Sequence, residues 1–456
     1  THTDAETLAR VHAGLERVLH DVRVAVADWR AMRGQLREAM AETGAMRITL
    51  PSEEVAEAEA FLRWMDDDHF TFLGYREYRF DNDPCTGEPM LRMVDGSGQG
   101  ILRDKDFTVF DGLRHFQALP PDVRDFLRQP RVLMVTKANR KATVHRSTHM
   151  DAVLVKRFDA AGAIVGERLV VGLFTSSAYN RSPRDIPFLR RKVAEVLKRA
   201  GFDPRSHDGK ALLNILENYP RDELFQVGVE ELYDTAIGIL HLQERQRLAL
   251  FVRKDPFERF CSCLVYVPRD RYDTELRLRI QGILETALNG TCTGFTTQLA
   301  ESVLARVHFI IKTEPGRVPP IDGADIEGRL VQAARGWSDH LRDALVELRG
   351  DAAAITLMAR YGGAFPVGYR EAFSAEAAVH DIDRVESVLA RGRVAINLYR
   401  PLEADPAEVS FKLYHEGRPV PLSDVLPMLE HMDLKVITEL PIELTLADRP
   451  HPVWIH

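Results

Sequence analysis

Apolar residues near the start of the chain recur at alternating intervals of three and four, the spacing that places them on one face of a helix. The stripe comprises Leu8, Val11, Leu15, Val18, Val22, Ala25, Trp29, Met32, Leu36 and Ala39. It predicts one long helix over residues 3–42. Leu19, Val26 and Met40 widen the stripe, which favours packing against a broad surface over a two-stranded coiled coil. A dimer seam is the alternative.

A second helix is predicted from Ser52, with Val55, Ala58, Leu62 and Met65 as its apolar face. The run rich in aromatic and β-branched residues that follows predicts a strand, with Gly74 at a bulge. Similar runs predict the strands of a mostly antiparallel sheet at 70–80, 90–94, 131–137, 152–158 and 168–175.

The acidic run Asp66-Asp67-Asp68-His69 stands between that helix and the first strand. Consecutive aspartates in extended chain point to opposite faces, so they converge on one ion only if the loop curls. We therefore interpret the run as a solvated helix-to-strand junction. A metal or acid/base site is the alternative.

Ser182 and Pro183 have the residue types of a helix start, and Gly201 those of a helix stop. A helical connector is predicted over 206–246. Residues 247–350 and 393–456 then repeat one order of two strands, a helix and two strands, at an offset of 146 residues (393 minus 247). A long helix at 326–348 closes the first copy, and the second copy lacks an equivalent.

The predicted class is α+β, and the chain is multidomain. An antiparallel sheet domain is followed by α/β sandwiches that helical connectors join. The predicted boundaries are a long helical linker at 1–50, the sheet domain at 51–205, a connector at 206–246, a sandwich at 247–350, a connector at 351–392 and a C-terminally truncated sandwich at 393–456.

Composition narrows the class of protein. With 456 residues, a formal net charge of −8 and 45% hydrophobic residues, the chain suits a globular protein and shows no overall attraction to nucleic acid or anionic membrane. Four cysteines are too few for a disulfide scaffold and favour a reducing cytoplasm. Because the chain starts at Thr1 and stops at the apolar run 452–456, we expect a piece of a longer polypeptide.

Motifs for catalysis or nucleotide binding are not matched. Gly96, Gly98 and Gly100 do not complete a dinucleotide fingerprint, because Ile101 stands where the third glycine belongs. Cys261 and Cys263 lie two apart on a predicted strand, which favours buried core thiols over a zinc site. We expect no catalytic residue, no metal site and no cofactor site.

Two polar stretches are the candidate binding sites. Arg181, Ser182 and Arg184 precede a predicted helix and form a candidate anion site. The turn at 268–274 joins a strand to a helix and offers Arg269, Asp270, Arg271, Asp273 and Thr274 as groups that could bind an amino acid. A solvated helix end and an ordinary capped turn are the respective alternatives.

Four stretches together resemble the large, single-chain bacterial NAD-dependent glutamate dehydrogenases. They are FLRWMDDDHFTFLGYREY at 61–78, GLFTSSAYNRSPRDIPFLRRKV at 172–193, FVRKDPFERFCSCLVYVPRDRYDTELR at 251–277 and LPMLEHMDLKV at 426–436. The resemblance is spread over nearly the whole chain.

The resemblance implies an N-terminal regulatory segment, with a PAS-like sheet domain followed by ACT-like (ferredoxin-like) sandwiches. It implies a parent enzyme that converts L-glutamate to 2-oxoglutarate with NAD, and a catalytic portion that lies beyond His456. The implied partners are that catalytic portion, further copies in a homo-oligomer, and an amino-acid effector. Two hypotheses follow: the segment senses a metabolite, or it is an assembly scaffold that binds nothing small.

Overall fold

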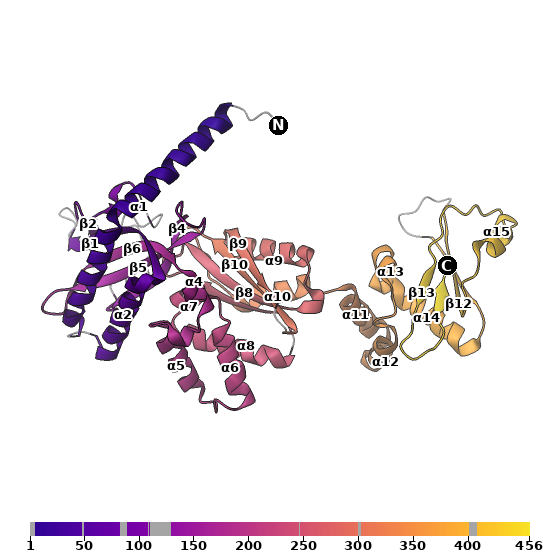
Figure 1. Ribbon diagram of the computed structural model, residues 1–456. Coiled ribbons are helices and arrows are strands. Elements are labelled where there is room, and N and C mark those ends of the chain that lie inside the picture. The colour runs from indigo at the N-terminus through magenta and orange to yellow at the C-terminus, as the bar shows by residue number, and fades with distance from the viewer. Residues whose placement is uncertain are drawn as a thin grey trace. The chain divides into compact units, whose positions relative to one another are not determined.

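The computed structural model describes residues 5–47, 50–82, 89–107, 109, 129–245, 247–299, 302–400 and 408–456. The chain divides into two compact units, Thr1–Leu330 and Val331–His456, which Figure 1 shows with their elements labelled. Each unit has a hydrophobic core of its own.

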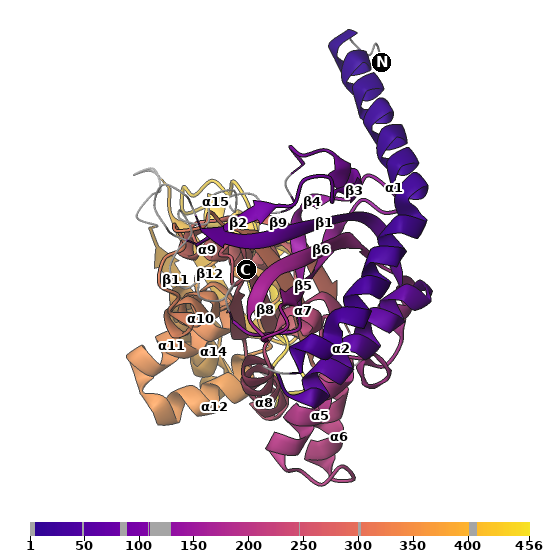
Figure 2. The ribbon, with the colours of Figure 1, turned by 90° about the vertical axis from the view of Figure 1, so that its left-hand side faces the viewer.

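The predicted long helix is present as α1, Ala5–Met46, and residues 1–4 lie outside the described part. Its second half is covered: Met32, Leu36 and Ala39 are buried in the main core. Most of the apolar stripe in its first half is exposed: Leu15 and Leu19 are 59% and 69% exposed. Figure 2 shows this half extending beyond the sheet. The apolar stripe therefore has two environments.

The first six strands form one sheet in which every pair is antiparallel, in the order β2-β1-β6-β5-β4, with the short β3 paired to β1. The register between β1 and β6 shifts between Phe72 and Gly74, so the predicted bulge is confirmed. The bounds are β1 Phe70–Asn82, β2 Pro89–Met93, β3 Gln99–Gly100, β4 Leu133–Lys141, β5 His149–Phe158 and β6 Ile164–Phe174.

Besides α1, the helix α2 precedes the sheet and the others follow it, and one of those that follow starts later than predicted. Ser182 caps only a single 3-10 turn, Pro183–Asp185, and the helix ending before Gly201 begins at Leu189. Phe188 has a φ of 72° and interrupts the path between them. The helices are α2 Ser52–Trp64, α4 Ser176–Asn180, α5 Leu189–Ala200, α6 His207–Glu217, α7 Arg221–Gln226 and α8 Val229–Arg245.

The first of the two repeated modules has the strand order β7-β8-β10-β9. Leu264 and Tyr266 of β8 belong to the same core as the residues of α6 and α8. Leu276, Ile280 and Leu284 are the buried residues of α9, which packs against β9 and β10. Both faces of this sheet are therefore covered. The bounds are β7 Ala249–Lys254, β8 Phe260–Pro268, α9 Thr274–Ala287, β9 Thr291–Gln298 and β10 Leu304–Lys312.

The single helix predicted at 326–348 is wrong. Two helices occur instead, α10 Gly323–Ala333 and α11 Trp337–Arg349. Gly336 separates them with extended backbone angles (φ −96°, ψ 172°) and stands at the N-cap of α11. The prediction failed because the apolar periodicity of the sequence continues through Gly336, although the backbone is not helical there.

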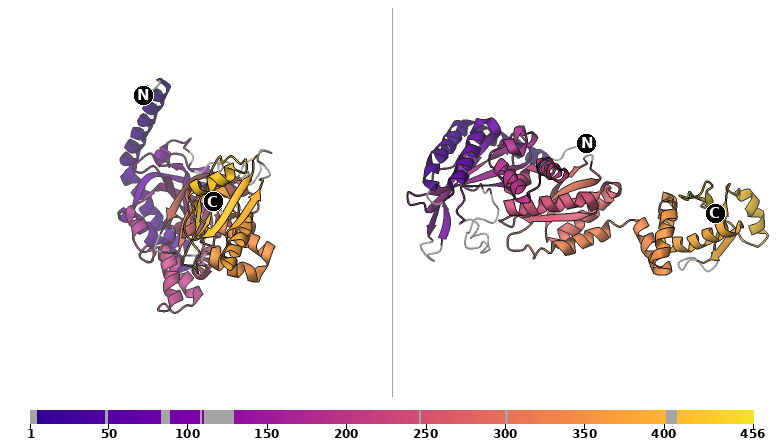
Figure 3. Two further views of the ribbon diagram at one scale, coloured as in Figure 1. Left: turned by 90° about the vertical axis from the view of Figure 1, so that its right-hand side faces the viewer. Right: turned by 90° about the horizontal axis from the view of Figure 1, so that it is seen from below.

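The second module repeats the strand order of the first, as β11-β12-β14-β13. Its sheet is covered on one face by α14, which packs against β11 and β12, and Figure 3 shows the helices of this unit beside its sheet. The cover thus comes from a helix that precedes the sheet. The bounds are α12 Asp351–Tyr361, α13 Val367–Ala372, α14 Ala375–Arg391, β11 Ala395–Tyr399, β12 Ser410–Glu416, α15 Leu422–Glu430, β13 Ile442–Leu444 and β14 Val453–Ile455.

Candidate functional site

A cavity of about 720 Å³ lies in the first unit, between the edge strand β4 and the start of the first module. We call it the β4 cavity. Four segments besides β4 contribute to its wall: the ranges 54–58, 188–195, 225–231 and 253–257. Its volume is within the ~300–1,000 Å³ of typical small-molecule sites, which often lie where domains meet.

The β4 cavity exposes the edge of a strand rather than one of its faces. Seven consecutive residues, 130–136, line it, although successive side chains of a strand alternate between faces. The amide of Lys156 in β5 donates to Val132 O at 2.9 Å. By antiparallel alternation Met134 and Thr136 also turn their backbone groups to β5, and Leu133, Val135 and Lys137 turn theirs outward.

The outward groups of β4 have different surroundings along the strand. Lys137 O accepts a hydrogen bond from Arg259 Nη1 at 2.7 Å. No hydrogen bond from the described residues reaches the outward N–H or C=O of Leu133 and Val135. Both residues line the β4 cavity, but as whole residues they are only 6% and 4% exposed.

Arg259 connects the first module to the sheet domain at the end of this cavity. It lies just before β8 and is buried, and its guanidinium pairs with Asp255 (Nε–Oδ2 2.8 Å). It also donates to Thr136 Oγ1 at 2.8 Å and to Asn139 Oδ1 at 3.1 Å, both on β4. One side chain thus links the sheet that contains β4 to the sheet of the first module.

A second buried ion pair joins β7 to α7. Arg253 Nε donates to Glu223 Oε2 at 2.6 Å, and Arg253 Nη2 donates to Glu223 Oε1 at 2.9 Å. Burial opposes ionisation of Glu223, but the charge and hydrogen bonds of Arg253 outweigh it and lower the pKa of this carboxyl. Arg253 lines the β4 cavity. Because Glu223 balances its charge, the pair adds no net charge to the cavity wall.

Lys192 brings a cationic group to the opposite wall. Its Nζ donates to the carbonyl oxygens of Leu224, Phe225 and Val227, at 3.1, 2.9 and 2.8 Å, and so closes the C-terminal end of α7. Burial, together with the cations Arg253 and Arg131, lowers the pKa of Lys192 to about 7. Three hydrogen bonds therefore hold the ammonium group in place, while burial disfavours its charged form.

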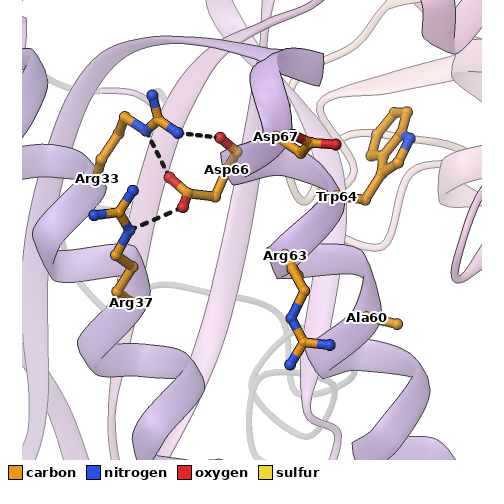
Figure 4. Close-up of a pocket in the computed structure, with 7 residues that line it drawn as sticks. All are labelled: Arg33, Arg37, Ala60, Arg63, Trp64, Asp66 and Asp67. Carbon is orange, nitrogen blue, oxygen red and sulfur yellow. Dashed lines mark hydrogen bonds and ion pairs between the residues drawn. The ribbon is translucent and has the colours of Figure 1, made fainter.

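The acidic run at the first helix-to-strand junction is solvated only in part: Asp67 and Asp68 are exposed, as predicted, and Asp66 is largely buried. Residues 65–69 form a π-helical turn, and Asp68 has a φ of 57°. Asp66 accepts from Arg33 Nε at 2.6 Å and from Arg37 Nε at 2.9 Å, as Figure 4 shows for the arginines that reach from α1. Burial opposes ionisation, yet these hydrogen bonds lower the pKa of Asp66.

This junction borders an open hollow of about 600 Å³ between α1 and α2. The Asp66 carboxylate pairs with two of the three arginines that line it, Arg33 and Arg37, and so ties the end of α2 to α1. Within the described ranges, no three His, Cys, Asp or Glu side chains cluster as a metal site would require.

The turn predicted to bind an amino acid lies on the surface. Arg269, Asp270 and Arg271 form an exposed 3-10 turn. Asp273 caps α9 by accepting from Leu276 N at 2.7 Å, and Thr274 begins that helix. These residues are adjacent, but none lines either of the two cavities above. The geometry favours a capped turn, and amino-acid binding here stays a prediction.

The residues of the candidate anion site lie next to the carboxylate of Glu217. Ser182 Oγ accepts from Arg184 N at 3.2 Å and donates to Glu217 Oε1 at 2.7 Å. Arg181 and Arg184 are exposed, and Arg181 O accepts from Arg221. A neighbouring carboxylate repels an anion, so this geometry favours a structural turn, and the anion site also stays a prediction.

The thiols of Cys261 and Cys263 are buried and unbonded to each other. Burial raises the pKa of Cys261 to about 11, which makes it a poor nucleophile and metal ligand.

In the second unit, Asp381 of α14 accepts from Lys412 Nζ at 2.6 Å and from Tyr414 Oη at 2.7 Å. That buried pair fixes α14 on its sheet.

Family profiles match four stretches of the chain. Their descriptions are glutamate dehydrogenase ACT2 domain (residues 249–338), helical motif 1 (186–245), ACT3 domain (393–456) and helical motif 2 (344–388). No helix among the described residues has the length and apolar character that a bilayer crossing requires.

Three relatives are similar to the chain along nearly all of its length, and each bears the name NAD-specific glutamate dehydrogenase. That of Halomonas elongata is 42% identical over 460 residues, that of Pseudomonas aeruginosa 39% over 458, and that of Mycobacterium tuberculosis 31% over 468. These alignments cover 100%, 99% and 99% of this chain but 28%, 28% and 27% of the relatives.

The modules and the helices between them define a class, that of ACT-domain segments with interspersed helical motifs. Within it, the chain belongs to the NAD-specific glutamate dehydrogenases, of which it is a segment. It spans little more than a quarter of the length of the relatives it matches.

The β4 cavity was missed at the sequence level. Its wall combines five separated ranges, and no single range carries a binding motif. One local signal was available: Arg253-Lys-Asp-Pro-Phe-Glu-Arg259 puts charged residues in the turn of a predicted hairpin, where a buried ion pair was not expected. Which strand that turn would meet depends on the tertiary fold.

Proposed function

We propose that this chain is a non-catalytic regulatory segment of an NAD-specific glutamate dehydrogenase and that it senses a small metabolite. The parent reaction would be the oxidation of L-glutamate to 2-oxoglutarate and ammonium with NAD, carried out by other parts of a cytoplasmic enzyme. The first sheet domain would be the PAS-like member of the segment. NAD would bind to the catalytic portion, which is one partner of this chain, and further copies would form a homo-oligomer.

The observation that supports sensing is the position of the β4 cavity. A ligand there would touch the sheet domain, helical motif 1 and the ACT2 domain together. Arg259 and the Arg253–Glu223 pair adjoin the same space. A ligand shifts the equilibrium between two conformations only if it binds one of them more tightly. A ligand in a cavity between domains would do so if the domains move relative to each other between the two conformations.

Two assays test this proposal. The isolated chain should form no NADH from glutamate and NAD, and the full-length enzyme should form it. A metabolite that raises the melting temperature of the isolated chain should also change the initial rate of the full-length enzyme. Glutamate oxidation by the chain alone, or a full-length rate that ignores every stabilising metabolite, would contradict the proposal.

A second function, assembly, is favoured by the exposed half of α1. Leu8, Leu15, Leu19 and Val26 are each 59–70% exposed on this helix, a larger apolar stripe than a solvated helix needs. If the stripe carries assembly, Leu15→Glu with Leu19→Glu should lower the mass measured by light scattering for the full-length enzyme. An unchanged mass would leave sensing as the supported role.

A further inference from the structure

We infer that the first unit associates with a second copy of itself along β9, the open edge strand of the ACT2 sheet, and along the neighbouring helix α9. This inference rests on the assembly function proposed above and names a surface for it other than α1. The chemistry of the β9 edge, the apolar side chains beside it and a row of charges on α9 all point to this partner.

The two edges of the ACT2 sheet differ. At the β7 edge, the amide of Leu250 donates to Glu327 Oε2 of α10 at 2.9 Å, so an outward backbone group is paired within the chain. At the other edge, β9 pairs with β10 and with no second strand in the part of the chain that the structure describes (Figure 1). An edge of this kind presents backbone donors and acceptors to another strand.

The outward backbone groups of β9 follow from its register. The amide of Cys292, at the start of the strand, donates to Glu285 Oε1 of α9 at 2.8 Å and so points away from β10. One extra residue follows Cys292 where the register with β10 shifts, and strand alternation then turns the N–H and C=O groups of Phe295 and Thr297 outward as well. These groups can form a ladder with a second strand.

The side chains of β9 do not protect this edge against pairing. Residues 291–298 read TCTGFTTQ and include neither a charged residue nor a proline, which are two of the devices that keep natural edge strands apart. Two copies of this strand can lie side by side without like charges facing each other. The edge is therefore compatible with a copy of itself.

Exposed apolar side chains accompany the same edge. Phe295, Leu299 and Val303 are 47%, 54% and 49% exposed, and Leu278 of α9 is 53% exposed. Single exposed apolar residues are ordinary, but these four belong to the hairpin of β9 and β10 and to the helix that packs against it. Covering them would add hydrophobic stabilisation to a backbone ladder.

The charges of α9 select a second copy as the partner. Arg277, Gln281 and Glu285 follow at intervals of four and so share one side of the helix. The guanidinium of Arg277 lies 4.3 Å from the ring centroid of Phe295, and Glu285 accepts from Cys292 N, so this side faces β9. A two-fold axis that pairs two β9 strands antiparallel also sets two α9 helices antiparallel. Arg277 of one copy then meets Glu285 of the other, and opposite charges face each other twice.

The first test is sedimentation equilibrium of the 456-residue chain. We expect a mass that rises with concentration toward twice the 51.6 kDa of one chain. Arg277→Glu and Glu285→Arg should each weaken association by about tenfold or more, because each brings like charges together across the two-fold axis.

An equimolar mixture of these two variants should associate within about twofold of wild type, because every contact between the copies again joins opposite charges. Recovery on mixing requires contact between two copies, and a structural role within one chain does not produce it. A chain that stays monomeric, variants that associate as wild type does, or a mixture that shows no recovery would each overturn the inference.

Gly282→Cys tests the same surface in the full-length enzyme. Gly282 follows Gln281 on α9, and nothing lies within 4 Å of a Cβ built on it. Oxidation with copper phenanthroline should join two copies at this position and give a dimer on a non-reducing gel. Gly328→Cys on α10 is the matched control, since Gly328 is also exposed, helical and open around its Cβ.

No dimer with Gly282→Cys, or as much dimer with Gly328→Cys, would overturn the inference. The assembly function is decided separately. If Leu15→Glu with Leu19→Glu still lowered the mass of the full-length enzyme, assembly would stand and would depend on α1 instead of β9.

Discussion

Arg259 connects the ACT2 domain to the sheet domain through hydrogen bonds to Thr136, Lys137 and Asn139. Arg259→Met would leave Asp255, which is fully buried, without its cation. Breaking a buried ion pair in this way costs about 3–5 kcal/mol. We expect a loss of that size in the urea unfolding of the first unit.

Arg205→Met is the matched control for this substitution. Arg205 has a side chain that is 92% exposed and lies 3.8 Å from Asp203, and surface pairs of this kind contribute about 0–1 kcal/mol. If Arg259→Met cost no more than Arg205→Met, the bridge would not hold the two sheets together.

Lys192 should give the first unit a specific dependence on pH. Its folded pKa of about 7 lies below the value of about 10.4 for an unfolded lysine. Between these values the unfolded chain binds a proton that the folded chain does not, so stability rises with pH. Below pH 7 both states are protonated, and the cost of burying the charge is fully present.

The measurement compares urea midpoints of wild type and Lys192→Met at pH 6.5 and pH 9.5. The variant cannot titrate at this position, so its advantage over wild type should shrink as the pH rises. A difference between the two proteins that stays constant with pH would show that Lys192 keeps its proton in the fold.

Residue-level prediction was most successful where neighbours in sequence decide the outcome. Gly201 adopts the left-handed cap and Gly74 adjoins the bulge, as predicted. It was least successful where a distant residue decides. Glu57 on α2 accepts from Phe188 N at 2.8 Å and so sets the start of α5. Asp66 is likewise held away from solvent by Arg33 and Arg37, which lie on the preceding helix, α1.

At the scale of elements, α9 and α15 occupy the same place in the repeated order but differ in packing. The helix α9 buries Leu276, Ile280 and Leu284, and α15 buries no residue. Pro427 also stands inside α15, where it removes a backbone hydrogen bond. We expect amides of α15 to exchange with solvent much faster than those of α9.

Hydrogen exchange read by mass spectrometry checks this expectation. Peptides from α14 serve as the internal control, since α14 has a continuous buried face that includes Val379, Ile382 and Val385. Protection of α15 equal to that of α14 would contradict the packing described above.

Strand prediction from pattern was more successful than helix prediction. The strands have strongly patterned residues and short connections, and their antiparallel arrangement was expected. The helix predicted at 326–348 failed because apolar periodicity passes through Gly336 without recording its extended angles. The second copy lacks a closing helix, so its sheet was expected either to borrow cover from a neighbour or to be loosely ordered. The cover comes from α14, which the pattern did not identify because it does not show which surface a helix packs on.

For the whole molecule, two units with separate cores should unfold separately. The main core draws on the first unit, and the core around Tyr361, Tyr369 and Tyr414 draws on the second. Differential scanning calorimetry should show two transitions, and the calorimetric enthalpy should exceed the van't Hoff enthalpy of a single one. One cooperative transition would contradict this division.

The β4 cavity belongs to this largest scale, and the sequence could not predict it. Its wall unites ranges as far apart as 54–58 and 253–257. The resemblance gave the family and the repeated modules, but the place of β4 in the cavity wall follows from strand order and from the packing of α5, α7 and α8. Sites of this kind depend on contacts that no local pattern contains.

The most direct measurement of the central claim uses the full-length enzyme. The initial rate of glutamate oxidation would be measured with and without a metabolite that raises the melting temperature of the isolated chain. Wild type would be compared with Gly228→Trp, which enlarges a residue that lines the β4 cavity. Regulation through the β4 cavity predicts equal rates without effector and a response that Gly228→Trp abolishes. A response that is the same in both proteins would contradict it.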